Sequence, residues 1–142
     1  MKKRSEGLLP VGWKWRLPTE SEWEYGARGG TTGARYGELE AIAWWSGNSS
    51  FETHVVGGKQ ANAWGLNNMM GNVWEWCADW YGDYPTGSVT DPAEPSSGSF
   101  RMSRGGSWDF GGESIRSADR RRFDPGDRCC SLGFRPVLSS VR

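Results

Sequence analysis

Residues 101–136 constrain the fold more than any other part of this chain, because they follow no regular period. Residue types that set a backbone or fill a core recur among them: Arg104, Gly105, Gly106, Ser107, Trp108, Arg116, Ala118, Arg120, Pro125, Arg128, Gly133, Phe134 and Arg135. We call these the framework residues. The positions between them match neither a helical nor a strand repeat, which predicts an irregular surface. This contrast is typical of a fixed frame that carries changeable side chains.

The positions between the framework residues form a second set, which we call the aperiodic positions: Asp109, Phe110, Gly111, Gly112, Ser114, Asp119, Arg121, Arg122, Phe123, Asp124, Asp127, Cys129, Cys130 and Ser131. None of them is Lys, Glu, Gln, Met or Trp. Lys, Glu and Gln are ordinary surface residues, so their joint absence is informative. We predict that all except Gly112 bind a ligand. Of these, all except Asp119 and Arg122 are expected to face solvent on one surface, above buried Trp108, Arg116, Arg120 and Phe134.

The composition predicts one compact domain over residues 1–142, because this length suits a single core. The chain has 21 Gly and 7 Pro, which predict many turns, and 10 Trp and 5 Phe, which must supply the core. We place four tryptophans in that core: Trp23, Trp74, Trp76 and Trp80.

Local signals predict a few short elements. Thr19 and Glu22 form a capping box, so a helix is expected from Glu20 to about Arg28, before Gly29. Alternation predicts a strand over 73–80 with one aromatic face. Strands are also expected over 100–103 and 132–138, with a long display loop between them, and a surface excursion over 82–98.

Three motifs carry a family resemblance: RLPTESEWEYGARGG (16–30), NNMMGNVWEWCADWY (67–81) and RGGSW…GFRP (104–136). Together they resemble the formylglycine-generating-enzyme, or sulfatase-modifying-factor, family. The resemblance implies an α+β domain with a loop-rich variant of the C-type lectin fold. That family's oxidase centre uses two cysteines, at positions where this chain has Phe110 and Ile115. Neither side chain can replace a copper-binding thiolate, which disfavours the oxidase activity.

The chain also resembles the variable proteins of diversity-generating retroelements, in which adenines of template Asn codons are randomised. Such codons become any codon ending in a pyrimidine, which excludes the five residue types missing from the aperiodic positions. No Asn follows Asn72, which is the outcome expected if heavy diversification has replaced the Asn codons of the template. Residues 101–136 are therefore interpreted as a variable, displayed region. The alternative is ordinary drift in a relative that has lost catalysis.

The family resemblance also implies a structural calcium site and a longer domain. The calcium ligands would be Asn68, Gly71, Val73 and Glu75, two through side chains and two through backbone carbonyls. Plain hydrogen bonds of the two side chains are the alternative. The family domain has a strand and a helix before the first motif, so we expect either a shortened fold or a partner chain or oligomer that completes it.

The charge distribution and the cysteine content limit the classes of partner and of metal site that the chain can have. Residues 101–142 hold nine Arg against five acidic residues, but interleaved acids and the absence of a nucleic-acid motif argue against nucleic acid. The three cysteines suggest no disulfide framework, and one histidine suggests no zinc site. No signal peptide or membrane-spanning run is recognised, so cytoplasmic location is the default expectation, with export or incorporation into a virion left open.

Three functions remain open on the sequence. The favoured one is a non-catalytic module that presents a diversified surface to a protein or glycan ligand. The second is an oxidase that converts a sulfatase cysteine to formylglycine, and the third is a catalytically dead partner subunit.

Overall fold

The computed structural model describes residues 11–84, 86–88 and 95–140. The predicted helix is confirmed as α1 (Glu20–Arg28). The Thr19 hydroxyl accepts from the Glu22 amide at 3.1 Å, and the Glu22 carboxylate accepts from the Thr19 amide at 2.9 Å. Gly29 ends the helix in a left-handed conformation with φ 52°. Local capping chemistry therefore fixes both ends of α1.

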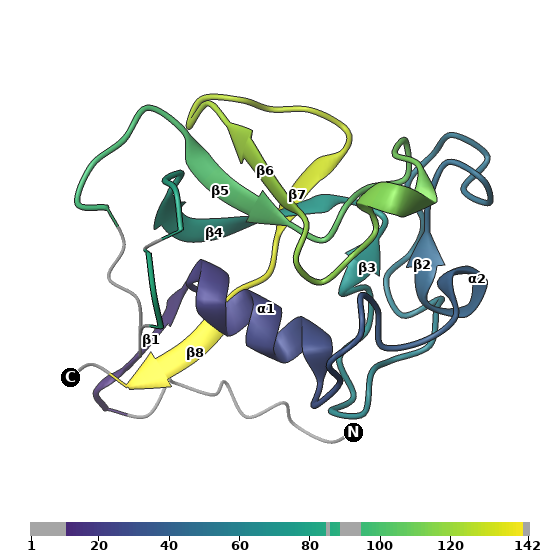
Figure 1. Ribbon diagram of the computed structural model, residues 1–142, viewed down its shortest axis with the longest axis horizontal. Coiled ribbons are helices and arrows are strands. Elements are labelled where there is room, and N and C mark those ends of the chain that lie inside the picture. The colour runs from purple at the N-terminus through teal and green to yellow at the C-terminus, as the bar shows by residue number, and fades with distance from the viewer. Residues whose placement is uncertain (1–10, 85, 89–94, 141–142) are drawn as a thin grey trace, which may run out of the picture.

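A four-stranded sheet lies along α1, in the order β6-β5-β4-β7 (Figure 1). Its strands are β4 (Trp74–Trp80), β5 (Arg101–Arg104), β6 (Arg120–Phe123) and β7 (Leu132–Phe134). Strand β5 runs antiparallel to both β4 and β6, whereas β7 runs parallel to β4. The expected strand over 100–103 is confirmed with a shift of one residue.

Two predictions about the C-terminal segment were wrong. The loop between β5 and β7 contains β6 and a 3₁₀ turn at Gly112–Ser114, so it is not free of regular structure. Residues 132–138 are not one strand, because β8 (Val137–Ser140) leaves the sheet after β7 and pairs with β1 (Trp13–Arg16). Pro136, which has no amide hydrogen, lies between the two strands.

Short elements complete the fold. Helix α2 (Leu39–Ile42) leads into β2 (Ala43–Trp44), which pairs in parallel with β3 (Met70–Gly71). Gly71 has φ 69°, and a Cβ there would lie 2.1 Å from the Trp44 carbonyl oxygen. Only glycine permits this close approach of β2 and β3.

The core lies between α1, α2 and the inner face of the four-stranded sheet. Its buried side chains are Trp23, Ala27, Ile42, Ala43, Met69, Met70, Cys77, Met102 and Ile115. Trp74 is also buried, but Trp76 and Trp80 are only half-buried, which corrects their assignment to the core. The buried face of β4 is instead formed by Glu75, Cys77 and Asp79.

Some sequence expectations concern residues outside the described ranges. Residues 1–10, where a leader was sought, and residues 85 and 89–94 of the expected surface excursion are among them. The described residues of 82–98 are exposed or half-buried. No helix among the described residues is long and apolar enough to cross a membrane.

Candidate binding surface

The outer face of the four-stranded sheet, turned away from α1, carries most of the aromatic side chains of the strands. Trp76 of β4 is paired with Phe134 of β7, and Phe123 of β6 with Arg101 of β5, so their side chains share that face. Arg121 joins them two residues before Phe123. Alternate residues of β6 therefore face the core side and the open side of the sheet.

Aperiodic side chains meet on this outer face. The Phe110 ring packs edge-on against Trp74, with 5.4 Å between centroids, and Phe123 packs edge-on against Trp76 at 5.8 Å. The Arg121 guanidinium lies 4.6 Å from the Phe110 ring centroid and 5.7 Å from that of Phe123. Residues 13 positions apart are therefore joined into one surface through a cation–π contact.

The loop before β7 extends the same surface. Cys129 and Cys130 are exposed free thiols, and the Cys130 carbonyl accepts a long hydrogen bond of 3.4 Å from the Trp108 indole. Ser131 was expected to face solvent, but it is 9% exposed. Its carbonyl accepts from the Trp74 amide at 2.8 Å, so residue 131 belongs to the sheet edge.

We define the display surface as the outer-face residues that these contacts and pairings join, together with three residues of the adjoining loops. The outer-face residues are Trp76, Phe110, Arg121, Phe123 and Phe134, and the loop residues are Trp108, Cys129 and Cys130. Asp109, Asp124 and Asp127 adjoin it along the chain and are exposed. The Asp127 carboxylate accepts from the Asp124 amide at 3.0 Å and shapes the turn after β6.

Four predicted ligand-binding residues are placed elsewhere. Arg122 lies on the inner side of β6, where its guanidinium stacks over Tyr81 and Phe100. Asp119 pairs with Arg116 at 2.8 Å. Gly111 precedes the 3₁₀ turn and Ser114 is its last residue, and both are half-buried. A Cβ on Gly112 of this turn would meet the Leu39 and Trp45 side chains. None of these four residues takes part in the ring and cation–π contacts that join Phe110, Arg121 and Phe123.

The framework residues are less buried than predicted. Phe134 is 69% exposed and the Arg116 side chain is 50% exposed, so both predictions of burial were wrong. Trp108 is half-buried, and the Arg120 side chain is 17% exposed. Phe134 is open because strand β7, which pairs it with Trp76, places it on the outer face of the sheet.

Buried arginines fix the sheet on α1 from its inner face. The Arg104 side chain, 1% exposed, pairs with Glu20 at 2.8 Å and Glu24 at 2.5 Å, and donates to the Ser117 carbonyl at 2.8 Å. Arg120 donates to both Glu20 oxygens, at 2.6 and 2.9 Å. Burial disfavours the charged form of Arg120, but its bonds to Glu20 outweigh this and raise the pKa of its guanidinium. This network holds β6, and with it the display surface, in place.

Comparison with known proteins identifies the fold. Residues 2–140 match the model of the sulfatase-modifying factor enzyme 1-like domain. The chain belongs to this family. It is 38% identical to the formylglycine-generating enzyme of Streptomyces coelicolor, over 84% of this chain and 45% of that protein. It is also 42% identical to the serine/threonine-protein kinase pkn1 of Chlamydia caviae, over 84% of this chain and 20% of the kinase.

A solved structure extends the likeness. Treponema denticola variable protein 1 is 41% identical with a TM-score of 0.83, over 89% of this chain and 48% of that one. The resemblance to a variable protein and the α+β fold of the formylglycine-generating-enzyme type, related to C-type lectins, are thereby confirmed. The chain spans about half or less of the length of these relatives.

The positions of the family's oxidase cysteines hold apolar side chains with structural contacts. Ile115 is 0% exposed within the core, and Phe110 covers Trp74. The buried Cys77 lies in β4, where burial raises the pKa of its thiol, so it remains protonated. No group of three or more His, Cys, Asp or Glu side chains among the described residues is arranged to hold a metal ion.

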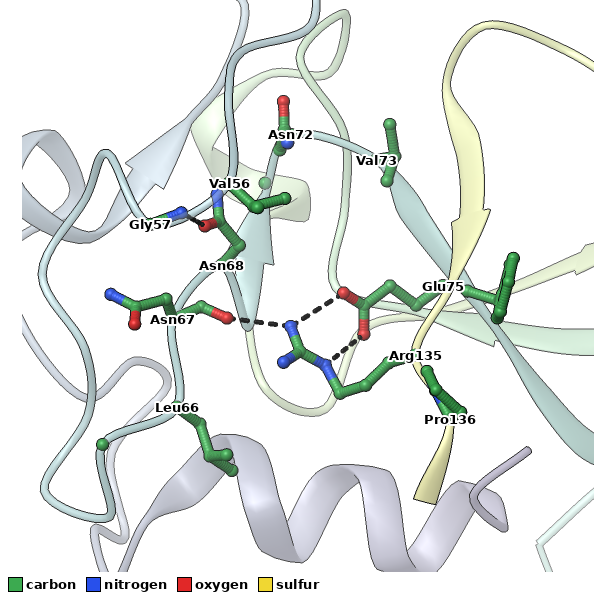
Figure 2. Close-up of a pocket in the computed structure, with 13 residues that line it drawn as sticks. Val56, Gly57, Leu66, Asn67, Asn68, Asn72, Val73, Glu75, Arg135 and Pro136 are labelled. Carbon is green, nitrogen blue, oxygen red and sulfur yellow. Dashed lines mark hydrogen bonds and ion pairs between the residues drawn. The ribbon is translucent and has the colours of Figure 1, made fainter. Parts of the chain in front are cut away.

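The residues of the family's calcium site line one cavity of about 490 Å³, together with Arg135 (Figure 2). The Glu75 carboxylate accepts from Arg135 at 2.9 and 3.0 Å and from the Trp23 indole at 2.8 Å. The Asn68 side-chain oxygen accepts from the Gly57 amide at 2.7 Å. One lone pair remains on each of Glu75 Oε1 and Asn68 Oδ1, so the oxygen donors fit a calcium ion. The positive charge of the neighbouring Arg135 guanidinium, however, disfavours the binding of a metal cation in this cavity.

Calcium binding therefore stays a prediction, and we expect it to be weak. Titration calorimetry with CaCl₂ should give a dissociation constant in the millimolar range, about 10⁻⁴–10⁻³ M, as in calcium modules with few charged ligands. Asn68→Ala should abolish the heat. Binding that is tight, or that survives Asn68→Ala, would place the ion elsewhere.

Proposed function

We propose that this chain is a non-catalytic ligand-binding protein whose display surface is diversified by a retroelement. The observation that carries the proposal is the meeting of Phe110, Arg121 and Phe123, from separate aperiodic stretches, on one open face of a sheet. The few residues that dominate the binding energy of protein interfaces are enriched in aromatic side chains and arginine. The likeness to Treponema denticola variable protein 1 supports the same function.

The substitutions at Phe110 and Ile115 support a binding role over an oxidase role. An oxidase needs two thiolates that face one another at an open site, whereas Ile115 is sealed in the core. The formylglycine-generating oxidase remains the alternative because of the 38% identity to such an enzyme. Aldehyde formation on a sulfatase peptide by the protein with Cys129→Ser and Cys130→Ser would establish that alternative.

Diversification and ordinary drift leave different traces in the DNA beside the gene. Diversification requires a near-copy of the coding sequence for residues 101–136, with adenines at the aperiodic codons, beside a reverse-transcriptase gene. A catalytically dead paralogue that serves as a fixed partner subunit requires neither.

The binding role predicts that display residues can change without loss of the fold. The variant Phe110→Tyr, Arg121→Ser, Phe123→Tyr and Asp127→Ser keeps both rings, so we expect it to lose no more than about 2 kcal/mol of unfolding free energy. Peptides selected from a random phage-displayed library on the wild-type protein should lose at least tenfold in affinity for the variant. Urea denaturation and fluorescence titration measure the two effects.

A matched control changes four exposed residues away from the display surface: Lys14→Ser, Tyr25→Phe, Glu52→Ser and Val55→Thr. It should bind the selected peptides like the wild type. Equal loss of binding in both variants would contradict a binding role of the display surface.

A further inference from the structure

An apolar hollow of about 470 Å³ lies at the edge of the display surface. It is lined by Leu17, Trp76, Cys77, Ala78, Arg101 and Pro125. The side chains of Trp76, Ala78 and Arg101 point to the outer face of the sheet, and Pro125 belongs to the turn that follows Phe123. Only Arg101 brings a charged side chain to this lining, so the hollow suits an apolar group.

Two arginines near the hollow make cation–π contacts with aromatic rings. The Arg101 guanidinium lies 3.6 Å from the Trp80 ring centroid, and Arg121 lies over Phe110 and Phe123. The register pairs Arg101 with Phe123 and Ser103 with Arg121, so the two arginines are diagonal neighbours on adjacent strands. The backbones of these two arginines are therefore about 7–8 Å apart. Their guanidinium groups extend toward opposite ends of β4, because Arg101 stacks on Trp80 and donates to the Ala78 carbonyl, whereas Arg121 lies 6.0 Å from the Trp74 ring centroid.

The positive charge of these two arginines is not neutralised within the described part of the chain. No carboxylate of the described residues lies within 4.0 Å of either guanidinium, unlike those of Arg104, Arg120 and Arg135. The strand residues of this face include no Asp or Glu. The carboxylates of Asp124 and Asp127, in the next turn, accept backbone amide bonds. The sheet face is therefore apolar and positively charged.

Resting on the function proposed above, we propose that this face binds an exposed protein segment that carries a carboxylate beside an aromatic or aliphatic side chain. The apolar side chain enters the hollow against Trp76 and Pro125. The carboxylate pairs with Arg101, which lines the hollow, and Arg121 adds a second positive charge farther along the same face. Both guanidinium planes are already held by aromatic rings and so lose little freedom on binding. A glycan fits less well, because its hydroxyl groups would lack hydrogen-bond partners in the apolar hollow.

The test is the composition of peptides that a random phage-displayed library yields on the immobilised protein. We expect selected sequences to be enriched in Asp or Glu next to Phe, Trp, Leu or Ile. Arg101→Gln and Arg121→Gln should each lower the affinity of a selected synthetic peptide at least tenfold, and 0.5 M NaCl should do the same. Lys14→Gln, which removes one exposed positive charge on β1, should have no effect. Arg101→Lys keeps the charge and should restore part of the affinity.

Different failures have different meanings. Selected peptides that are neutral or basic, but are lost on Phe123→Ser, would overturn the acidic partner and leave the binding function standing. Peptides indifferent to every display-surface change, or no selected peptide at all, would overturn both. A dimer that dissociates on Phe123→Ser in sedimentation velocity would assign the face to a second copy of this chain. Binding of carboxylated glycans in place of peptides would also overturn the proposal. Arg121 is exposed, so Arg121→Gln remains informative if Arg101→Gln fails to fold.

Discussion

Replacing Arg104 with Gln should lower the free energy of unfolding by about 3–5 kcal/mol, because it removes a buried cation from between two carboxylates and leaves each of them with less compensating charge. The Arg104 side chain is 1% exposed and lies between Glu20 and Glu24 of α1. Glu20 would keep Arg120, but Glu24 would keep only Arg28, and the Ser117 carbonyl would lose its donor. Urea denaturation followed by tryptophan fluorescence measures the change.

Arg121→Gln is the matched control for Arg104→Gln. Arg121 lies on the neighbouring strand of the same sheet, but it is exposed and faces the opposite side. Substitutions at such positions usually change stability by about 0.5 kcal/mol or less. If the two variants lose the same stability, the Arg104 network does not hold the sheet on α1.

Elements fixed by neighbours in the sequence were predicted well. The ends of α1 depend on Thr19, Glu22 and Gly29, which all lie within or beside the helix, so the capping pattern alone reveals it. The strand over 73–80 was also found, beginning one residue later at Trp74. Strand β6 was missed because its sequence, RRRF, resembles a basic patch, and only its pairing with β5 makes it a strand.

The faces of β4 show what the sequence could not reveal. Hydrophobicity suggests that Trp76 and Trp80 face the core, yet Glu75 and Asp79 are the buried residues. Glu75 meets Arg135, 60 residues away, and Asp79 accepts from the Glu20 amide at 2.6 Å. Burial raises the pKa of the Asp79 carboxyl group, although the hydrogen bond from the Glu20 amide acts to lower it. Partners this distant in the sequence decide which face is buried.

The same reversal affected the candidate site. Phe110, Arg121 and Phe123 were recognised by their lack of period, and the structure joins them through cation–π contacts, whereas Cys129 and Cys130 are exposed in the loop before β7. Trp76 and Phe134 were missed as surface residues because aromatic residue types suggest burial, and Arg101 was assigned to a strand without a prediction of its exposure. A signal was nevertheless present: a strand that alternates tryptophan with carboxylates has two unlike faces, and the sheet can bury either one.

Trp74→Ala should be the second severe change, with a loss of about 3–5 kcal/mol, the usual cost of truncating a buried Trp or Phe. Trp74 is 1% exposed and lies under Phe110 and Arg121, so its removal leaves a cavity beneath the display surface. Thermal denaturation should show a large fall in Tm. Peptide binding should fall as well, since Phe110 would lose the ring on which it rests.

Phe134→Ala is the matched comparison, because residue types alone suggest the same cost for both positions. Phe134 lies on the neighbouring strand β7 but is 69% exposed, so its truncation removes little buried area. We expect it to change stability by about 0.5 kcal/mol or less and to weaken binding of a selected peptide. A loss equal to that of Trp74→Ala would mean that Phe134 is covered in solution, and the outer face of the sheet would then be an internal or intermolecular contact and not an open binding surface.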